Sequence, residues 1–94
     1  MAVSFAERIR ATEEVLIQEI QGEIMFLNMA SESYFGLDQV GSQMYRMLTS
    51  TESIQAAYAA LLQEFDVDAD RLRADLQELI AKLLESGLIE LQHA

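Results

Sequence analysis

The sequence predicts an α+β fold in which a three-stranded antiparallel β-meander is followed by three α-helices. Two observations lead to this prediction. Apolar and β-branched residues follow strand-like patterns from Val15 to Leu37, and Gln21-Gly22 interrupts them with a turn signal. From Asp38 onward, apolar residues recur at the spacing of one helix face. We expect residues 15–91 to form a single domain, because a chain of 94 residues is close to the usual domain size.

Three stretches fit the meander. Val15–Ile20 is rich in β-branched residues, and Gly22 after it can take the positive φ that a tight hairpin turn demands. Glu23–Asn28 is apolar on both faces, which favours the central strand. Ser33–Leu37 alternates like a third strand and leads into Asp38, a residue type that caps helix N-termini.

The second half of the chain is predicted to be helical. Thr51 is expected to cap a second helix and Asp68 a third, which runs over residues 69–85 and stops at Gly87. Residues 88–91 then form a short extended tail. The apolar faces of the three helices comprise Val40, Met44, Met47 and Leu48; Ile54, Ala57, Tyr58, Leu61, Leu62 and Phe65; and Leu72, Leu76, Leu79, Ile80 and Leu83.

Residues 1–14 are polar with isolated apolar positions, so we expect a flexible N-terminal arm. Glu7, Arg8 and Arg10 stand where a signal peptide would need an apolar block. No run of about 18 apolar residues could span a membrane. We therefore expect a cytoplasmic protein without a membrane partner.

Composition excludes several functions. The chain has no cysteine, which removes disulfides, thiolate catalysis and cysteine-based zinc sites. Its net charge is −10, with 16 acidic residues against six basic ones. Nucleic acids bind clustered Lys and Arg, so we expect no nucleic-acid partner. The acidity favours solubility, and steering of a charged partner is the alternative interpretation.

No catalytic residue, metal ligand or cofactor site is predicted. Asp66, Asp68 and Asp70 have the spacing that opens a calcium loop, but Arg71 and Gln77 occupy the positions that need glycine and glutamate. Helix capping explains the acidic run better. His93 is the single histidine and lies next to the C-terminus, so the usual nucleophile–base pairs cannot be built.

Two helices joined by a short turn, followed by a third helix, also describe a winged helix-turn-helix. A recognition helix reads DNA through basic and polar side chains. Here Arg71, Arg73 and Lys82 lie among Asp70, Asp75, Glu78 and Glu85. The charge pattern therefore disfavours a DNA-binding function, although the architecture itself can be winged-helix-like.

A series of short motifs follows in a characteristic order along the chain: Gly22-Glu23, Leu27-Asn28, Tyr34-Phe35-Gly36-Leu37-Asp38, Val40-Gly41, Phe65-Asp66-Val67-Asp68, Leu72, Asp75-Leu76, Leu83 and Gly87-Leu88-Ile89. This ordered set resembles the PqqD family of RiPP recognition elements, which serve ribosomally made and post-translationally modified peptides. The likeness is greatest to free-standing members that bind lasso-peptide leaders. It covers about residues 15–89.

The resemblance implies a non-catalytic adaptor that binds the leader of a precursor peptide as a fourth strand. The leader would lie between the third strand and the third helix, and a separate cysteine protease or another modifying enzyme would be the partner. The implied peptide-binding residues are Ser33, Tyr34, Phe35, Gly36, Leu37, Arg71, Leu72, Asp75 and Leu79.

The physical pattern agrees with strand addition. An unpaired edge strand is usually blunted by lysine or proline, and residues 33–37 contain neither. Alternatives remain open: a PqqD-type adaptor for a radical SAM enzyme, a structural domain whose edge pairs with its own copy, or a DNA-binding domain. A monomer is expected, and a dimer only for the self-pairing alternative.

Overall fold

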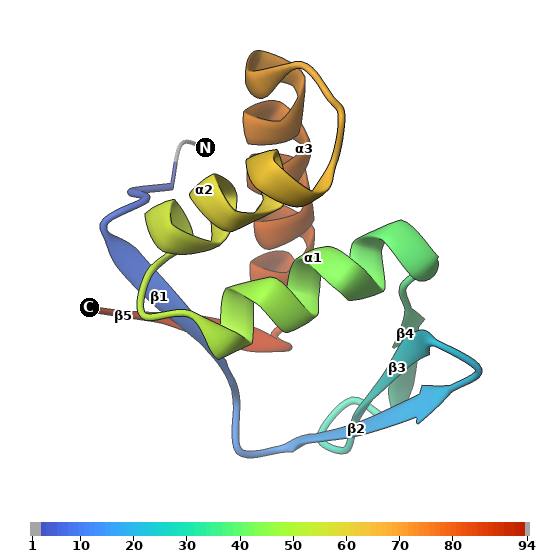
Figure 1. The fold of residues 1–94 in the computed structure, drawn as a ribbon. Helices are drawn as coiled ribbons and strands as arrows, with labels where there is room; N and C mark the ends of the chain where they lie inside the picture. Colours follow the sequence, from blue (N-terminus) through green and yellow to red (C-terminus); the bar gives the residue numbers. More distant parts are fainter. Residues whose placement is uncertain (1–2, 94) are drawn as a thin grey trace.

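The computed structural model describes residues 3–93. The elements follow in the order β1 (Glu7–Ala11), β2 (Val15–Ile20), β3 (Glu23–Asn28), β4 (Ser33–Gly36), α1 (Gln39–Ser50), α2 (Ile54–Glu64), α3 (Ala69–Glu85) and β5 (Ile89–His93) (Figure 1). The β2–β3–β4 meander and the three helices confirm the predicted α+β fold. A second, two-stranded sheet pairs β1 with β5.

The β2–β3 hairpin turns at Gln21 and Gly22, which have φ of 53° and 83°. Two consecutive positive φ angles are typical of the two-residue hairpin turn that matches the twist of the strands. The turn sets the register, in which Ile20 pairs with Glu23 and Val15 with Asn28. The three strands therefore lie where the sequence predicts them, except that β4 ends one residue earlier, at Gly36.

Each helix begins at a side-chain cap. Asp38, Ser53 and Asp68 each accept a hydrogen bond from the backbone N–H three residues further on. The prediction that Thr51 caps α2 is wrong. Thr51 instead follows the end of α1, where its hydroxyl donates to the carbonyl of Met47 at 2.8 Å. Ser50 Oγ also donates to this carbonyl at 3.3 Å, so both hydroxyls satisfy a carbonyl in the last turn of α1.

The third helix has the predicted bounds and buries the predicted apolar face. It ends in a Schellman motif. Gly87 has φ of 71°, Leu88 N–H donates to Leu83 O at 3.0 Å, and Gly87 N–H donates to Leu84 O at 3.1 Å. The residues after it form β5 rather than a free extended tail.

The N-terminal segment differs from the flexible arm predicted for residues 1–14. Residues 1 and 2 lie outside the described part, but β1 pairs with β5 over its full length, and Val3, Phe5 and Ile9 are buried. The Phe5 ring also packs edge-on against Tyr58, with centroids 5.8 Å apart. The segment is too short to show a period by itself. Its order comes from contacts with α1, α2, α3 and β5, which are all distant in sequence.

The meander is joined to the helices through Phe26, which is fully buried. Its ring meets Tyr45 of α1 edge-on at 5.0 Å and Phe35 of β4 at 6.4 Å. Arg46 of α1 also pairs with Glu19 and donates to Gly22 O at 2.9 Å. These contacts hold the hairpin and β4 in place beneath α1. Among the described residues, no helix is long and apolar enough to cross a membrane.

Candidate functional site

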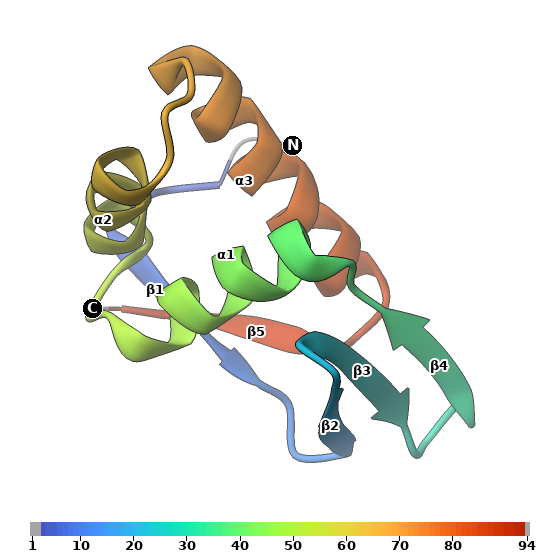
Figure 2. The same ribbon diagram turned by 45° about the vertical axis from the view of Figure 1, so that its right-hand side comes forward.

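The strand β4 lies at one edge of the meander. The strand order is β2–β3–β4, and within residues 3–93 the outer side of β4 has no strand partner. Figure 2 shows β4 as the outermost strand on the right of the sheet. Backbone groups on that side are available for pairing with another extended segment.

One hydrogen bond reveals which backbone groups of β4 point outward. Leu37 N–H donates to Ile24 O at 2.9 Å, so this N–H faces β3. Successive residues of a strand present their N–H and C=O groups to opposite sides. Phe35 therefore also faces β3, whereas Tyr34 and Gly36 present their backbone groups to the open side.

Ser42 of α1 ends the ladder between β3 and β4. Its hydroxyl is buried, accepts from Ile24 N–H at 2.8 Å and donates to Leu37 O at 3.4 Å. It thus stands in for the second bond of the Ile24–Leu37 pair and fixes where β4 leaves the sheet. The sequence analysis missed this role. The available signal was a small polar residue on the buried side of a helix.

A groove of about 330 Å³ runs between β4, the start of α1 and α3. Phe35, Gly36 and Leu37 line one side of it, and Asp75 and Leu79 line the other. The remaining lining residues are Asp38, Val40, Gly41, Met44, Glu78 and Lys82. The groove thus combines an open strand edge, apolar side chains and charged groups.

The charged groups in the groove differ in their surroundings. Glu78 forms an exposed ion pair with Lys82 at 3.0 Å, and the Asp38 carboxylate caps α1. Asp75 is exposed on the same side of α3. The groove lining therefore carries three carboxylates, Asp38, Asp75 and Glu78, and one ammonium group, that of Lys82.

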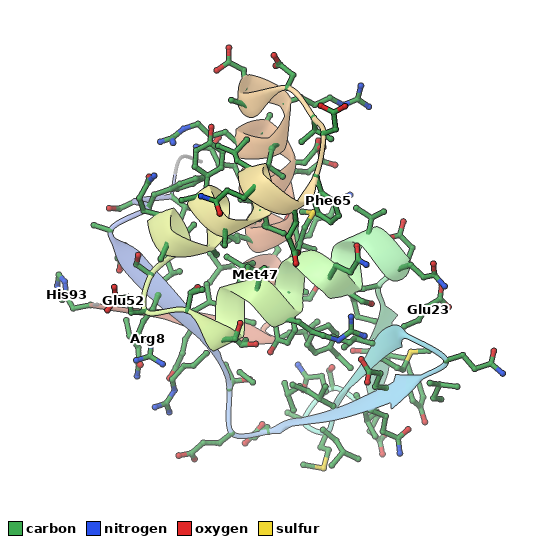
Figure 3. All side chains as sticks on the ribbon, in the orientation of Figure 1. Arg8, Glu23, Met47, Glu52, Phe65 and His93 are labelled. Atoms are coloured by element: carbon green, nitrogen blue, oxygen red, sulfur yellow. The ribbon has the colours of Figure 1, made fainter. Side chains whose placement is uncertain are left out.

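A smaller hollow of about 170 Å³ adjoins the groove and shares Val40, Met44 and Asp75 with it. Arg71 and Leu72 line this hollow. Its other lining residues are Phe65 and Val67. Phe65 lies at the end of α2, facing α1 (Figure 3). The hollow is mostly apolar and extends the groove toward the start of α3.

The structure brings together most of the peptide-binding residues expected from the sequence. Phe35, Gly36, Leu37, Asp75 and Leu79 line the groove, and Arg71 and Leu72 line the adjoining hollow. Ser33 and Tyr34 line neither. Tyr34 is 72% exposed on the opposite face of the sheet, and Ser33 begins the strand. These two residues would contribute to binding a strand only through their position on the β4 edge, and not by lining the groove.

Three groove residues from α1 were not expected: Val40, Gly41 and Met44. The sequence placed Met44 on a buried helix face, and it is indeed buried. One edge of that face also borders the groove. A 3.6-residue period predicts which face of a helix is buried, but it does not predict which edge of that face remains accessible to a ligand.

Three other titratable groups, Asp68, Tyr45 and His93, lie outside the groove lining. Asp68 caps α3, as the capping interpretation of the acidic run predicts. Within residues 3–93, no group of three or more His, Asp or Glu residues could hold a metal ion. His93 lies at the end of β5, away from the groove (Figure 3). Burial raises the pKa of the Tyr45 phenol above its usual value.

Comparisons with known proteins identify one family and two similar solved structures. The sequence profile of the PqqD family, described as coenzyme PQQ synthesis protein D, matches residues 23–89. A structure described as TbiB1 in complex with the TbiA(beta) leader peptide is 27% identical, covers 86% of this chain and 94% of its own, and has a TM-score of 0.79. No curated protein matches the chain.

A second solved structure supports the fold. It is described as lasso peptide synthetase B1 complexed with the leader peptide, and its TM-score is also 0.79. The match covers 88% of this chain and 98% of the other at 19% identity. At that identity the likeness extends to the architecture of sheet and helices.

Proposed function

This chain belongs to the PqqD family, and from that premise we propose that it binds the leader segment of a ribosomally made, modified precursor peptide of the lasso class. One observation carries the proposal: the unpaired edge of β4 lies directly beside the groove toward α3. The two similar structures are described as complexes with leader peptides, and one of them is 27% identical to this chain.

Binding would proceed by strand addition. The outward N–H and C=O groups of Tyr34 and Gly36 pair with the leader backbone, which supplies affinity with little dependence on sequence. Alternate leader side chains then point toward the groove, where Leu37, Leu79 and Met44 offer apolar contacts. Shape and charge there, including Asp75, supply the specificity.

The chain acts as an adaptor rather than as a catalyst in this proposal. It lacks cysteine, and its single histidine lies outside the groove. It presents the precursor to a separate leader peptidase of the cysteine-protease type or to another modifying enzyme. A cytoplasmic location stays a prediction from the sequence.

Fluorescence anisotropy with a labelled synthetic leader tests the proposal. The probes are the TbiA(beta) leader and the leader of any precursor found to be encoded next to this chain, with a scrambled peptide as control. We expect saturable binding of at least one leader in the micromolar range or tighter, about −8 kcal/mol. Failure of both leaders to bind, or binding equal to that of the scrambled peptide, overturns the function.

A second assay tests the adaptor role. The chain is incubated alone with full-length precursor, and mass spectrometry follows the peptide. We expect an unchanged precursor mass. Cleavage or modification by the chain alone contradicts the non-catalytic role.

Self-pairing of β4 is the second candidate, because the same free edge can receive a second copy of the chain. The net charge of −10 opposes this association. Sedimentation of the leader-free protein separates the two. A stable dimer that leader peptide does not dissociate favours the structural alternative.

A further inference from the structure

Gly36 is not explained by the needs of its own chain. Glycine weakens a strand because it costs more conformational entropy and has no side chain to pack. Its φ is not in the positive range, unlike those of Gly22 and Gly87. A Cβ built at position 36 would meet only Met25, at 3.5 Å from Sδ and 3.6 Å from Cε, which is ordinary van der Waals contact. Neither backbone conformation nor internal packing requires glycine here.

Position 36 belongs to the face of the sheet that points away from the core. Phe35 and Leu37 face inward, so Tyr34 and Gly36 face outward. Across the ladder, Gly36 pairs with Met25 and Tyr34 pairs with Leu27. We call Tyr34, Gly36 and Met25 the outer shelf.

The outer shelf is open and apolar. Tyr34 is 72% exposed and Met25 is 37% exposed. A hollow of about 380 Å³ opens at its hairpin end, with Ile20, Met25 and Gly36 among its lining residues. Gly36 also lines the groove toward α3, so it lies between two hollows.

We propose that the outer shelf is a second specificity site, which receives an apolar or aromatic side chain of the bound leader lying across Gly36. This inference rests on the proposed function. A leader strand pairing with the outward groups of Gly36 places the residue opposite it on the outer face, because directly opposed residues share a face. The leader is then recognised on both sides, with its neighbouring residues in the groove.

The absence of a side chain at position 36 makes the contact possible. Opposed Cβ atoms in a sheet are about 5 Å apart, so a large side chain at position 36 would fill the space above the shelf. With glycine there, the leader side chain can reach Met25 and lie against the ring of Tyr34. Thioether and aromatic groups suit an apolar occupant.

A valine at position 36 tests the inference. Valine keeps the outward N–H and C=O and favours the strand conformation, so it preserves main-chain pairing. We expect Gly36→Val to weaken binding of the labelled leader by at least about tenfold, or roughly 1.4 kcal/mol. Gln18→Val is the matched control, because Gln18 is exposed in the same cross-strand row on β2. It should bind the leader within about twofold of the parent.

Alanine scanning of the leader then identifies the occupant. We expect one apolar leader residue whose alanine substitution weakens binding to the parent but not further to Gly36→Val, as a double-mutant cycle requires for groups in contact. Circular dichroism confirms folding, and Gly36→Ala repeats the test with a smaller side chain should valine unfold the domain.

The outcomes separate the two levels. A parent chain that binds no leader removes the proposed function and this inference with it. A parent that binds leader while the folded position-36 variants bind equally well overturns the outer shelf alone. The outer shelf is also overturned if Gly36→Val weakens binding but the double-mutant cycle shows no coupling to any leader residue. A leader-free dimer that Gly36→Val dissociates overturns it as well.

Discussion

Replacing Tyr34 with proline should weaken leader binding while leaving the domain folded. The Tyr34 N–H points to the open side of β4, as the Leu37-to-Ile24 hydrogen bond establishes for this strand. Proline removes that donor and fixes φ near −65°. The opposite substitution, Phe35→Pro, removes an N–H that faces β3.

The magnitudes follow from these positions. Loss of one net hydrogen bond costs about 0.5–1.5 kcal/mol, and leaving the leader carbonyl unpaired costs about 1–3 kcal/mol. Leader affinity should therefore fall about tenfold to a hundredfold. Folding should change little, because Tyr34 is 72% exposed and proline is tolerated where an edge N–H faces solvent. Phe35→Pro also loses the ring contact with Phe26, so it should destabilise the fold by about 3–5 kcal/mol.

Anisotropy of a labelled leader measures affinity, and thermal unfolding by circular dichroism checks the fold. Tyr34→Ala is the control, because it removes the ring but keeps the N–H. We expect Tyr34→Pro to bind at least about tenfold more weakly than Tyr34→Ala. If Tyr34→Pro is folded and binds as tightly as Tyr34→Ala, pairing at the open edge of β4 is the wrong mechanism.

Three further predictions concern the fold. Ile9→Ala should lower the free energy of unfolding in urea by about 2–5 kcal/mol, because Ile9 is 2% exposed; a change below about 0.5 kcal/mol would indicate a loose arm. Ser42→Ala should cost about 1–3 kcal/mol by leaving the Ile24 N–H unpaired, and an unchanged unfolding midpoint would rule out the bridge. Because burial raises the Tyr45 pKa, its neutral form is favoured in the folded state, so the associated stability is present below about pH 10 and lost as pH rises further. Tyr45→Phe should lose less stability than the parent between pH 9 and 11, and equal losses would contradict this.

Local sequence patterns suffice to predict much of the fold of this protein. The change of apolar period at Asp38 and the acidic caps at Asp38 and Asp68 act within a few residues of where they stand. The motif order also identified the PqqD family, which the match over residues 23–89 confirms. These features depend on backbone sterics and short-range hydrogen bonds, so they can be recognised without a tertiary structure.

The N-terminal segment shows where local patterns end. Val3, Phe5 and Ile9 are isolated apolar residues in a polar stretch, and nothing near them in sequence can bury them. Their partners are helices α1, α2 and α3 and the C-terminal strand β5. Burial of this kind depends on contacts made only after the chain has folded back on itself.

The candidate site likewise has features that the sequence predicts and features that only the tertiary structure reveals. Alternation along residues 33–37 predicts a strand whose side chains point to two opposite faces, and this can be recognised from the sequence. Three features depended on the tertiary structure: the outward amides of Tyr34 and Gly36, the Ser42 bridge, and the position of Asp75 across the groove from β4. The strand that pairs with β4 decides which of its N–H groups point to the open side. Likewise, the elements packed against a helix decide which edge of its apolar face stays exposed.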